Sequence, residues 1–174
     1  MTQWSRLIVI LGVLALASGV VPAGGQDEGK KSAVPQTKSV PFEPAPVSRE
    51  VMEANKRAAL EFYDAAINRK DYEAASRYMG PAYRQHNPLV ADGKEGFRAF
   101  LDMLKRDFPQ AHSEVKRVFA EGEYVILHVH SYRLPNTRGR AIFELLRFEN
   151  GKVVEHWDAI QEVPEKSANP NGMF

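Results

Sequence analysis

The chain has 174 residues, 44% of them hydrophobic, and its 23 Lys and Arg nearly balance its 22 Asp and Glu. This composition allows one domain with a sizeable core, and it includes no basic stripe of the kind that binds nucleic acid. The absence of Cys excludes disulfides, thiolate metal sites, Cys nucleophiles and lipid attachment through Cys.

Residues 1–23 have the pattern of a signal peptide. Arg6 supplies a positive charge, residues 7–17 (LIVILGVLALA) form an apolar run, and residues 21–23 (VPA) offer small side chains for cleavage. The run is shorter than the roughly 20 apolar residues of a membrane span, although an uncleaved anchor is the alternative. We therefore expect a secreted or periplasmic protein that contacts a membrane only through this segment, if it is not cleaved.

Residues 24–47 contain many Gly, Lys, Ser and Pro and few apolar side chains. Burial cannot offset the ordering entropy of such a segment, and its prolines favour extended conformations. We predict a disordered Pro/Gly-rich tether that leads to a folded domain over residues 48–164.

Two helices are predicted at the start of this domain. Ser48 can cap the first, in which apolar residues recur at helical spacing, namely Val51, Ala58, Phe62 and Ala66. Asp71 can cap the second, which would run to about Met79 and stop at Gly80-Pro81.

A third helix is predicted after an irregular segment over residues 83–88. Asp92 and Glu95 stand at capping-box spacing. The helix that follows has the clearest apolar series of the chain, with Phe97, Phe100, Leu101, Leu104 and Phe108 at one-face spacing.

The periodicity then changes from helical to alternating. It predicts strands at about 112–120, 123–133, 140–148 and 152–161, separated by Gly-containing turns. Helices followed by strands in hairpins indicate an α+β fold, with the helices packed on one face of an antiparallel sheet. The tail, residues 165–174, ends in Met173 and Phe174, which either dock on the domain or are disordered.

Two of these strands carry residues that could do chemistry. His128 and His130 lie two apart, so they share one face of their strand with Tyr132. This face could be solvent-exposed or hydrogen-bonded, could form a pocket wall, or could supply half of a metal site. His156 and Asp158 also share a face. A carboxylate buried among aromatic residues becomes more basic and can remove protons near neutral pH; the alternative is a charge pair in water.

The segment before the third helix offers His86 and Asn87. Loop residues beside a sheet often line pockets, so both are candidates for ligand contact. The alternative is a turn that the Asn side chain stabilises.

Five segments occur in a recognisable order, namely 83–88 (YRQHNP), 92–97 (DGKEGF), 128–130 (HVH), 148–158 (FENGKVVEHWD) and 171–174 (NGMF). Together they resemble the SnoaL-like proteins, a polyketide-cyclase-like branch of the nuclear transport factor two-like superfamily. The resemblance covers the chain from about residue 50 to its end. It implies a cone-shaped, curved antiparallel sheet wrapped around the N-terminal helices, a fold also called cystatin-like, with a deep pocket at the open end.

The resemblance also implies a chemistry. The family's cyclases carry out an intramolecular aldol condensation without metal or organic cofactor. Asp158 resembles their acid/base residue, His156 lies beside it, and Glu144 stands where those cyclases have a His. Members of the family usually pair through the outer faces of their sheets, which implies a homodimer.

We therefore expect a pocket for a small, mostly apolar ligand with a carbonyl group, and cofactor-free acid/base chemistry at the adjacent carbon with no metal. The expected catalytic residues are Asp158, His156 and Glu144, and the expected ligand-binding residues are His86, Asn87, His128, His130, Tyr132 and Trp157. In this scheme Asp158 takes the proton, while His128, His130 or Tyr132 stabilises the enolate oxygen.

Two other classes of function stay open. The domain could be a non-catalytic ligand-binding or dimerisation module. It could also be a metal-dependent enzyme that uses His128 and His130 with His86 or His156.

The hairpin at Asn150-Gly151 decides which side chains meet. A two-residue turn would place Glu144 opposite Trp157, whereas a three-residue loop with a bulged Gly151 would place it opposite His156 and near Asp158. We favour the bulged loop because it gathers the polar residues that the resemblance requires.

Overall fold

The computed structural model describes residues 43–174 of the chain. The predicted signal peptide and most of the predicted tether lie outside the described residues. Among the described residues, no helix is both long and apolar enough to cross a membrane. The elements in chain order are α1 (Arg49–Tyr63), a π-helical turn (Asp64–Asn68), α2 (Tyr72–Ser76), β1 (Met79–Gln85), α3 (Gly93–Asp107), β2 (His112–Glu121), β3 (Tyr124–Tyr132), β4 (Arg140–Glu149) and β5 (Lys152–Glu162).

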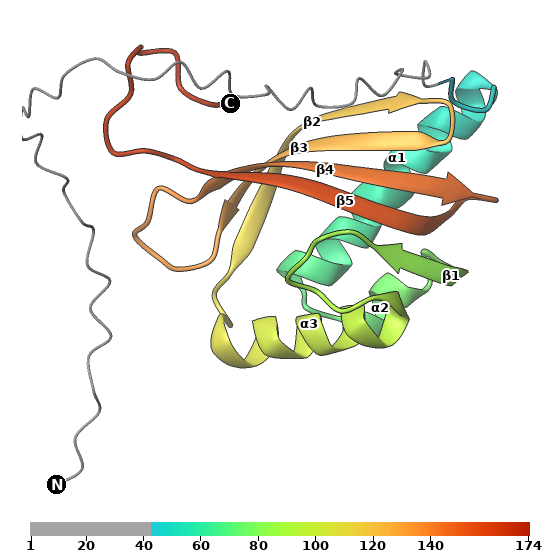
Figure 1. Ribbon diagram of the computed structural model, residues 1–174, viewed down its shortest axis with the longest axis horizontal. Helices are drawn as coiled ribbons and strands as arrows, with labels where there is room; N and C mark the ends of the chain where they lie inside the picture. The colour runs from blue at the N-terminus through green and yellow to red at the C-terminus, as the bar shows by residue number, and fades with distance from the viewer. Residues whose placement is uncertain (1–42) are drawn as a thin grey trace, which may run out of the picture. The chain divides into compact units, whose positions relative to one another are not determined.

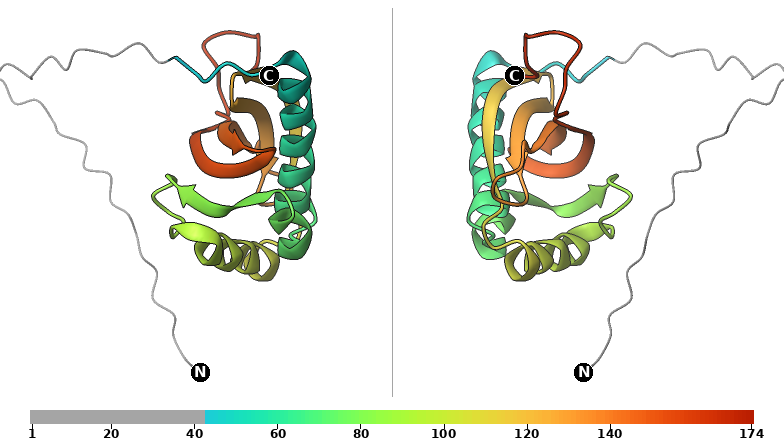
Figure 2. Two further views of the ribbon diagram at one scale, coloured as in Figure 1. Left: turned by 90° about the vertical axis from the view of Figure 1, so that its right-hand side faces the viewer. Right: turned by 90° about the vertical axis from the view of Figure 1, so that its left-hand side faces the viewer.

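The five strands form one curled sheet in the order β1-β5-β4-β3-β2 (Figure 1). β2 to β5 are antiparallel neighbours, and β1 pairs with β5 in parallel. Seen from the side, α1 runs along the curl and α3 lies across its lower end (Figure 2). This arrangement confirms the predicted α+β class with a curved sheet packed on the N-terminal helices.

α1 begins as predicted at Ser48, whose side chain accepts a hydrogen bond from the Val51 backbone N–H at 3.3 Å. The buried face of the helix comes from its second half, where Ala59, Phe62 and Tyr63 are almost inaccessible. Val51, which the apolar spacing included, is 43% exposed, so the first turn of the helix contributes little to the core.

The prediction for the second helix is wrong at its end. α2 ends at Ser76, and the residues expected to stop it form strand β1 instead. Pro81 cannot donate a backbone hydrogen bond, but β1 is an edge strand, where only one side needs donors. Backbone hydrogen bonds at both ends of β1 attach it to β5: the Tyr78 carbonyl accepts from the Val153 N–H, and the His86 N–H donates to the His156 carbonyl.

α3 covers the open side of the curl with Phe97, Leu101 and Leu104. The Phe97 ring stacks on Phe62 of α1 with the ring centres 5.5 Å apart. The expected capping box is not formed through Asp92: its carboxylate accepts the Gln85 backbone N–H at 2.8 Å and so ties the end of β1 to the start of α3.

The β4–β5 hairpin brings Glu144 close to Asp158 as expected, but its turn differs from the predicted one. Asn150 and Gly151 form a two-residue turn with positive φ at both positions (50° and 73°), as a type I′ turn requires, so the favoured three-residue loop is wrong. The register then shifts between Arg147 and Phe148. This bulge brings Glu144 opposite Asp158, on the inner face of the sheet.

Candidate functional site

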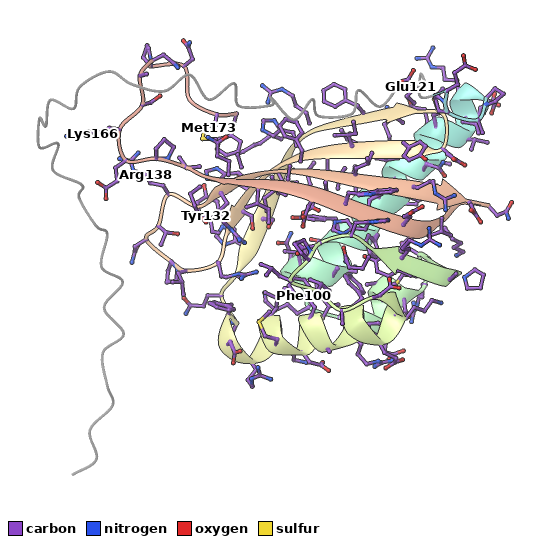
Figure 3. The ribbon with its side chains drawn as sticks, viewed as in Figure 1. Phe100, Glu121, Tyr132, Arg138, Lys166 and Met173 are labelled. Carbon is purple, nitrogen blue, oxygen red and sulfur yellow. The ribbon has the colours of Figure 1, made fainter. Side chains whose placement is uncertain are left out.

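A cavity of about 160 Å³ lies between the inner face of the sheet and the helices. Most of its wall is apolar, supplied by Phe62, Ile67, Phe97, Phe100, Met103, Leu104, Ile142 and Ile160 among others. Figure 3 shows Phe100 on the side of α3 that faces the sheet. A cavity of this volume has room for a ring about as large as benzene, and because the cavity is not fully enclosed, substituents on such a ring can extend beyond it.

Three polar side chains converge on one wall of this cavity. Glu144 comes from β4, and His156 and Asp158 come from β5, where alternation places both on the inner face. Ligand atoms of all three lie within 4.8 Å of one another. Glu144 is only 6% exposed, so its carboxylate depends on partners from the protein.

Gln85 determines the protonation of one ring nitrogen of His156. The Gln85 side-chain oxygen accepts the Asn87 backbone N–H at 2.8 Å, and it also lies 2.8 Å from His156 Nδ1. Because an amide oxygen only accepts hydrogen bonds, His156 Nδ1 must carry a proton. Its Nε2 lies 2.7 Å from a Glu144 oxygen, so the second ring nitrogen faces a carboxylate.

These partners decide the charge of His156. Burial by itself would lower the pKa of the imidazole, but the hydrogen bond and charge of Glu144, together with the charge of Asp158, raise that pKa above its ordinary value. His156 therefore stays protonated to a higher pH than a free imidazole, and in that state it donates to both Gln85 and Glu144.

This raised pKa predicts a pH dependence of stability. The folded protein holds the His156 proton more tightly than the unfolded chain, so the stabilisation is complete below about pH 6.5 and is lost as pH rises through the higher folded pKa. We expect the free energy of unfolding of the native protein to decline more steeply above about pH 6.5 than that of His156→Gln. Denaturant titrations of both proteins at several pH values check this, and parallel curves would contradict it.

Asp158 is positioned by the loop after β1. Asn87 Nδ2 donates to Asp158 Oδ2 at 2.6 Å, and the Asn87 side-chain oxygen accepts the Leu89 N–H at 2.8 Å, which fixes the orientation of the amide. Within residues 43–174, the other oxygen of Asp158 makes no hydrogen bond. One oxygen thus orients the carboxylate, and the other can accept a proton from a guest in the cavity.

Two tyrosines add hydroxyl groups to the same wall. The Tyr83 hydroxyl accepts from Gln85 Nε2 at 3.1 Å. Burial and the charges of Glu144 and Asp158 raise the pKa of Tyr83 far above its ordinary value, and burial with the charge of Glu144 does the same for Tyr63. Both hydroxyls therefore keep their protons and can donate.

The structure brings four of the predicted residues to this cavity, namely Glu144, His156, Asp158 and Asn87. It does not bring His128, His130 or Tyr132 there, although these three do share a face as predicted. Their face is the outer one, because the alternating residues of β3 that point inward are Val125, Leu127 and Val129.

The outer-face histidines have structural partners instead. His128 stacks on Phe143 at 4.5 Å, and its Nδ1 accepts from Arg117, while burial and the Arg117 charge lower its pKa. His130 Nε2 donates to the Arg138 carbonyl at 2.8 Å. Phe174 stacks on the His130 ring at 4.0 Å, so the end of the tail docks on this face. Tyr132, Arg138 and Met173 mark this region in Figure 3.

His86 and Trp157 also lie away from the cavity wall. Their rings stack on each other with centres 4.5 Å apart, and His86 Nε2 lies 2.8 Å from Glu155. The segment expected to be irregular is the end of β1, and alternation in a strand sends His86 to the face opposite Gln85 and Asn87. Neither ring is therefore placed to contact a guest in this cavity.

Sequence reasoning missed several residues of the wall: Tyr63, Tyr83, Gln85, Ser131, Arg133 and Arg140. Recognising β1 as a strand would have found two of them, because Tyr83, Gln85 and Asn87 alternate along it. The arginines carry no such signal, since each is an ordinary strand-end residue in the sequence.

The three convergent groups also have the chemistry of a cation site. Two carboxylates and an imidazole are common ligands of divalent metals. Both ring nitrogens of His156 are engaged, however, one with Gln85 and one with Glu144. A metal would have to replace one of those two hydrogen bonds. The metal site considered from the sequence, His128 and His130 with His86 or His156, is not among the clusters of possible metal ligands within residues 43–174. His156 lies on the opposite face of the sheet from His128 and His130.

Comparisons with known proteins agree with this geometry. Residues 57–166 match the family described as SnoaL-like polyketide cyclase. A SnoaL-like protein of unknown function from Burkholderia thailandensis has a TM-score of 0.55 and 19% identity, covering 67% of this chain and 99% of that one. An uncharacterized cystatin-fold protein from Novosphingobium aromaticivorans has a TM-score of 0.54 and 26% identity, covering 60% and 97%. A protein from Kribbella flavida proposed to be a ketosteroid isomerase has a TM-score of 0.54 and 19% identity, covering 70% and 85%. No curated protein matches significantly.

Proposed function

Because this chain belongs to the SnoaL-like polyketide cyclase family, as its sequence resemblance predicted, we propose that its cavity binds a small, mostly apolar molecule with a carbonyl group. Asp158 would then remove a proton from the carbon next to that carbonyl. The chemistry would be acid/base catalysis of the aldol-condensation or isomerase type, carried out by side chains alone.

The observation that carries this proposal is the setting of Asp158. Asn87 holds one carboxylate oxygen at 2.6 Å and leaves the other for a guest in a cavity with mostly apolar walls. A general base needs this combination of fixed geometry and access to the reacting carbon. The apolar wall also strengthens every interaction with developing charge, because it excludes water.

The proposed steps balance without a further reagent. The C–H bond breaks, its proton goes to Asp158, and its electron pair forms an enolate whose charge rests on the carbonyl oxygen. Tyr83 O–H, protonated and on the same wall, is the donor that would stabilise this oxygen. The proton then returns from Asp158 to another carbon in an isomerisation, or to the new alkoxide after the enolate carbon attacks a second carbonyl.

The experiment measures proton exchange on a model ketone. We would incubate the protein in D₂O with 3-(4-acetylphenyl)propanamide and follow loss of the acetyl methyl protons by NMR. The proposal expects exchange above the buffer rate. Binding of this ketone without any exchange would instead support a non-catalytic ligand-binding module.

A metal-dependent enzyme is the second candidate, favoured by the convergence of Glu144, His156 and Asp158. In that case the three side chains would hold a divalent cation that polarises the carbonyl. Elemental analysis of protein purified without added metal separates the two, because stoichiometric metal would favour this candidate and its loss to a chelator would abolish exchange.

We retain export as a proposal. It rests on the pattern of residues 1–23, which lies outside the described residues. Mass spectrometry of the protein from its native host should find a mature start near Gly24, and an intact N-terminus on cytoplasmic protein would contradict it.

A further inference from the structure

Two arginines line the same cavity at a distance from the acid/base groups. Arg140 opens β4 and lies opposite Ser131 of β3, and Arg133 follows two residues after Ser131. Along β4, Arg140 and Glu144 are separated by Ile142, which also lines the cavity. Four residues of strand correspond to about 13 Å between the Cα atoms, so an apolar stretch separates the two polar regions.

Neither guanidinium group is held by a carboxylate at ion-pair distance within residues 43–174. Among residues 43–174, Arg140 Nε is buried and has no hydrogen-bond partner. Arg133 lies over the ring of Phe108 with 4.9 Å to its centre, and in the described part of the chain neither side chain forms an ion pair. By contrast, Arg147 is held by Glu149 and Glu155.

This arrangement is unfavourable for the protein alone. The two positive side chains lie near each other and are partly buried. Burial together with the charge of Arg140 lowers the pKa of Arg133, and the charge of Glu162 opposes this lowering only in part. Glu162 lies opposite Arg140 in the ladder, but its side chain is exposed, and within residues 43–174 it forms no ion pair with either arginine. A buried guanidinium donor without an acceptor destabilises the folded state unless a ligand supplies the acceptor.

We propose that Arg133 and Arg140 form an anion subsite, so that the ligand carries a carboxylate in addition to its carbonyl. This inference rests on the proposed function, since it assigns the far end of the same ligand. The planar fork of a guanidinium group matches a carboxylate, and the Arg140 Nε–H is the unused donor. The ligand is then a keto acid in which an apolar linker about as large as one ring separates the carbonyl from the carboxylate.

The test compares two probes that differ only in charge. The acid 3-(4-acetylphenyl)propanoate and its amide share ring, linker and acetyl group. We expect calorimetry to show that the acid binds roughly tenfold to hundredfold more tightly, the range given by a charge-assisted hydrogen bond. In ¹⁵N-labelled protein, the Arg140 Nε–H resonance should shift with the acid and stay in place with the amide.

Variants assign the effect to the two residues. Arg140→Met and Arg133→Met should each remove most of the preference for the acid while leaving affinity for the amide nearly unchanged. Arg138→Met is the matched control, because Arg138 is exposed in the same segment and does not line the cavity, and it should keep the preference.

Three results would overturn the inference: equal affinity for the two probes, no detectable binding of the acid, or a preference that survives in both cavity variants. Other results would contradict the proposed function without contradicting the anion subsite. If neither probe exchanges its methyl protons while the acid still binds through the arginines, the anion subsite stands and catalysis does not. If the amide exchanges its methyl protons and the acid binds no more tightly than the amide, catalysis stands and the anion subsite does not.

Discussion

We expect replacement of Asp158 by Asn to lower the rate of methyl proton exchange in 3-(4-acetylphenyl)propanamide by about 10²- to 10⁴-fold, the usual contribution of a general base. The substitution keeps the shape of the side chain and removes the group that accepts the proton. Asn87 can still contact the new amide oxygen, so the geometry of the loop is preserved. NMR exchange rates at saturating ketone, measured for both proteins, give the ratio.

The control is Asp102→Asn, which makes the same chemical change on the exposed face of α3 and should leave exchange unchanged. Equal thermal unfolding of the native protein and Asp158→Asn would show that the loss is chemical. Full exchange activity in a folded Asp158→Asn protein would refute the assignment of the base. His156→Gln should reduce exchange by less, because His156 neutralises neighbouring carboxylates and does not itself take the proton in the proposed steps.

We expect replacement of His156 by Leu to destabilise the fold by about 3 kcal/mol, at the lower end of the range for breaking a buried charged pair. The loss follows because the Glu144 carboxylate is then buried without its cationic donor. Tyr63 lies close enough for the Glu144 charge to raise its pKa, and this neutral neighbour keeps the loss from being larger. Denaturant unfolding near pH 6 measures the difference.

A double variant separates this electrostatic effect from packing. Glu144→Leu together with His156→Leu removes both charges, and replacing a whole buried pair by apolar residues is often nearly neutral. We therefore expect the double variant to recover most of the stability that His156→Leu loses. If the double variant is as unstable as the sum of the two single variants, the pair does not act as a unit and the interpretation is wrong.

Local patterns accounted for most of the fold. The periodicity predicted α1, α3 and the four strands from β2 to β5 to within a few residues, because helical and alternating spacing reports directly on which side chains are buried. β1 escaped because its structure comes from pairing with β5, some 70 residues later in the chain. Without that pairing in view, Gly80 and Pro81 are typical of residues that end a helix.

The candidate site shows a second limit. Alternation correctly grouped His128, His130 and Tyr132 on one face, yet it did not say which face the helices cover. The apolar set of Val125, Leu127 and Val129 is the signal that settles it, because the hydrophobic face packs on the helices and so lines the enclosed space. The spacing of the histidines drew attention to them as candidate ligand contacts, but on this chain they pack against Phe143 and Phe174.

The sequence by itself determined the family, the α+β class, the four strands from β2 to β5 and the shared face of His156 and Asp158, because each depends on local spacing or on a series of short motifs. Only the tertiary structure placed Glu144 opposite Asp158, through a bulge that no turn signal marks. It also brought Gln85 at the end of the edge strand and Asn87 just after it onto these groups, and it left Arg140 Nε without a hydrogen-bond partner among residues 43–174. These features depend on long-range pairing and on the direction in which the sheet curls, and the cooperative packing of the whole domain decides both.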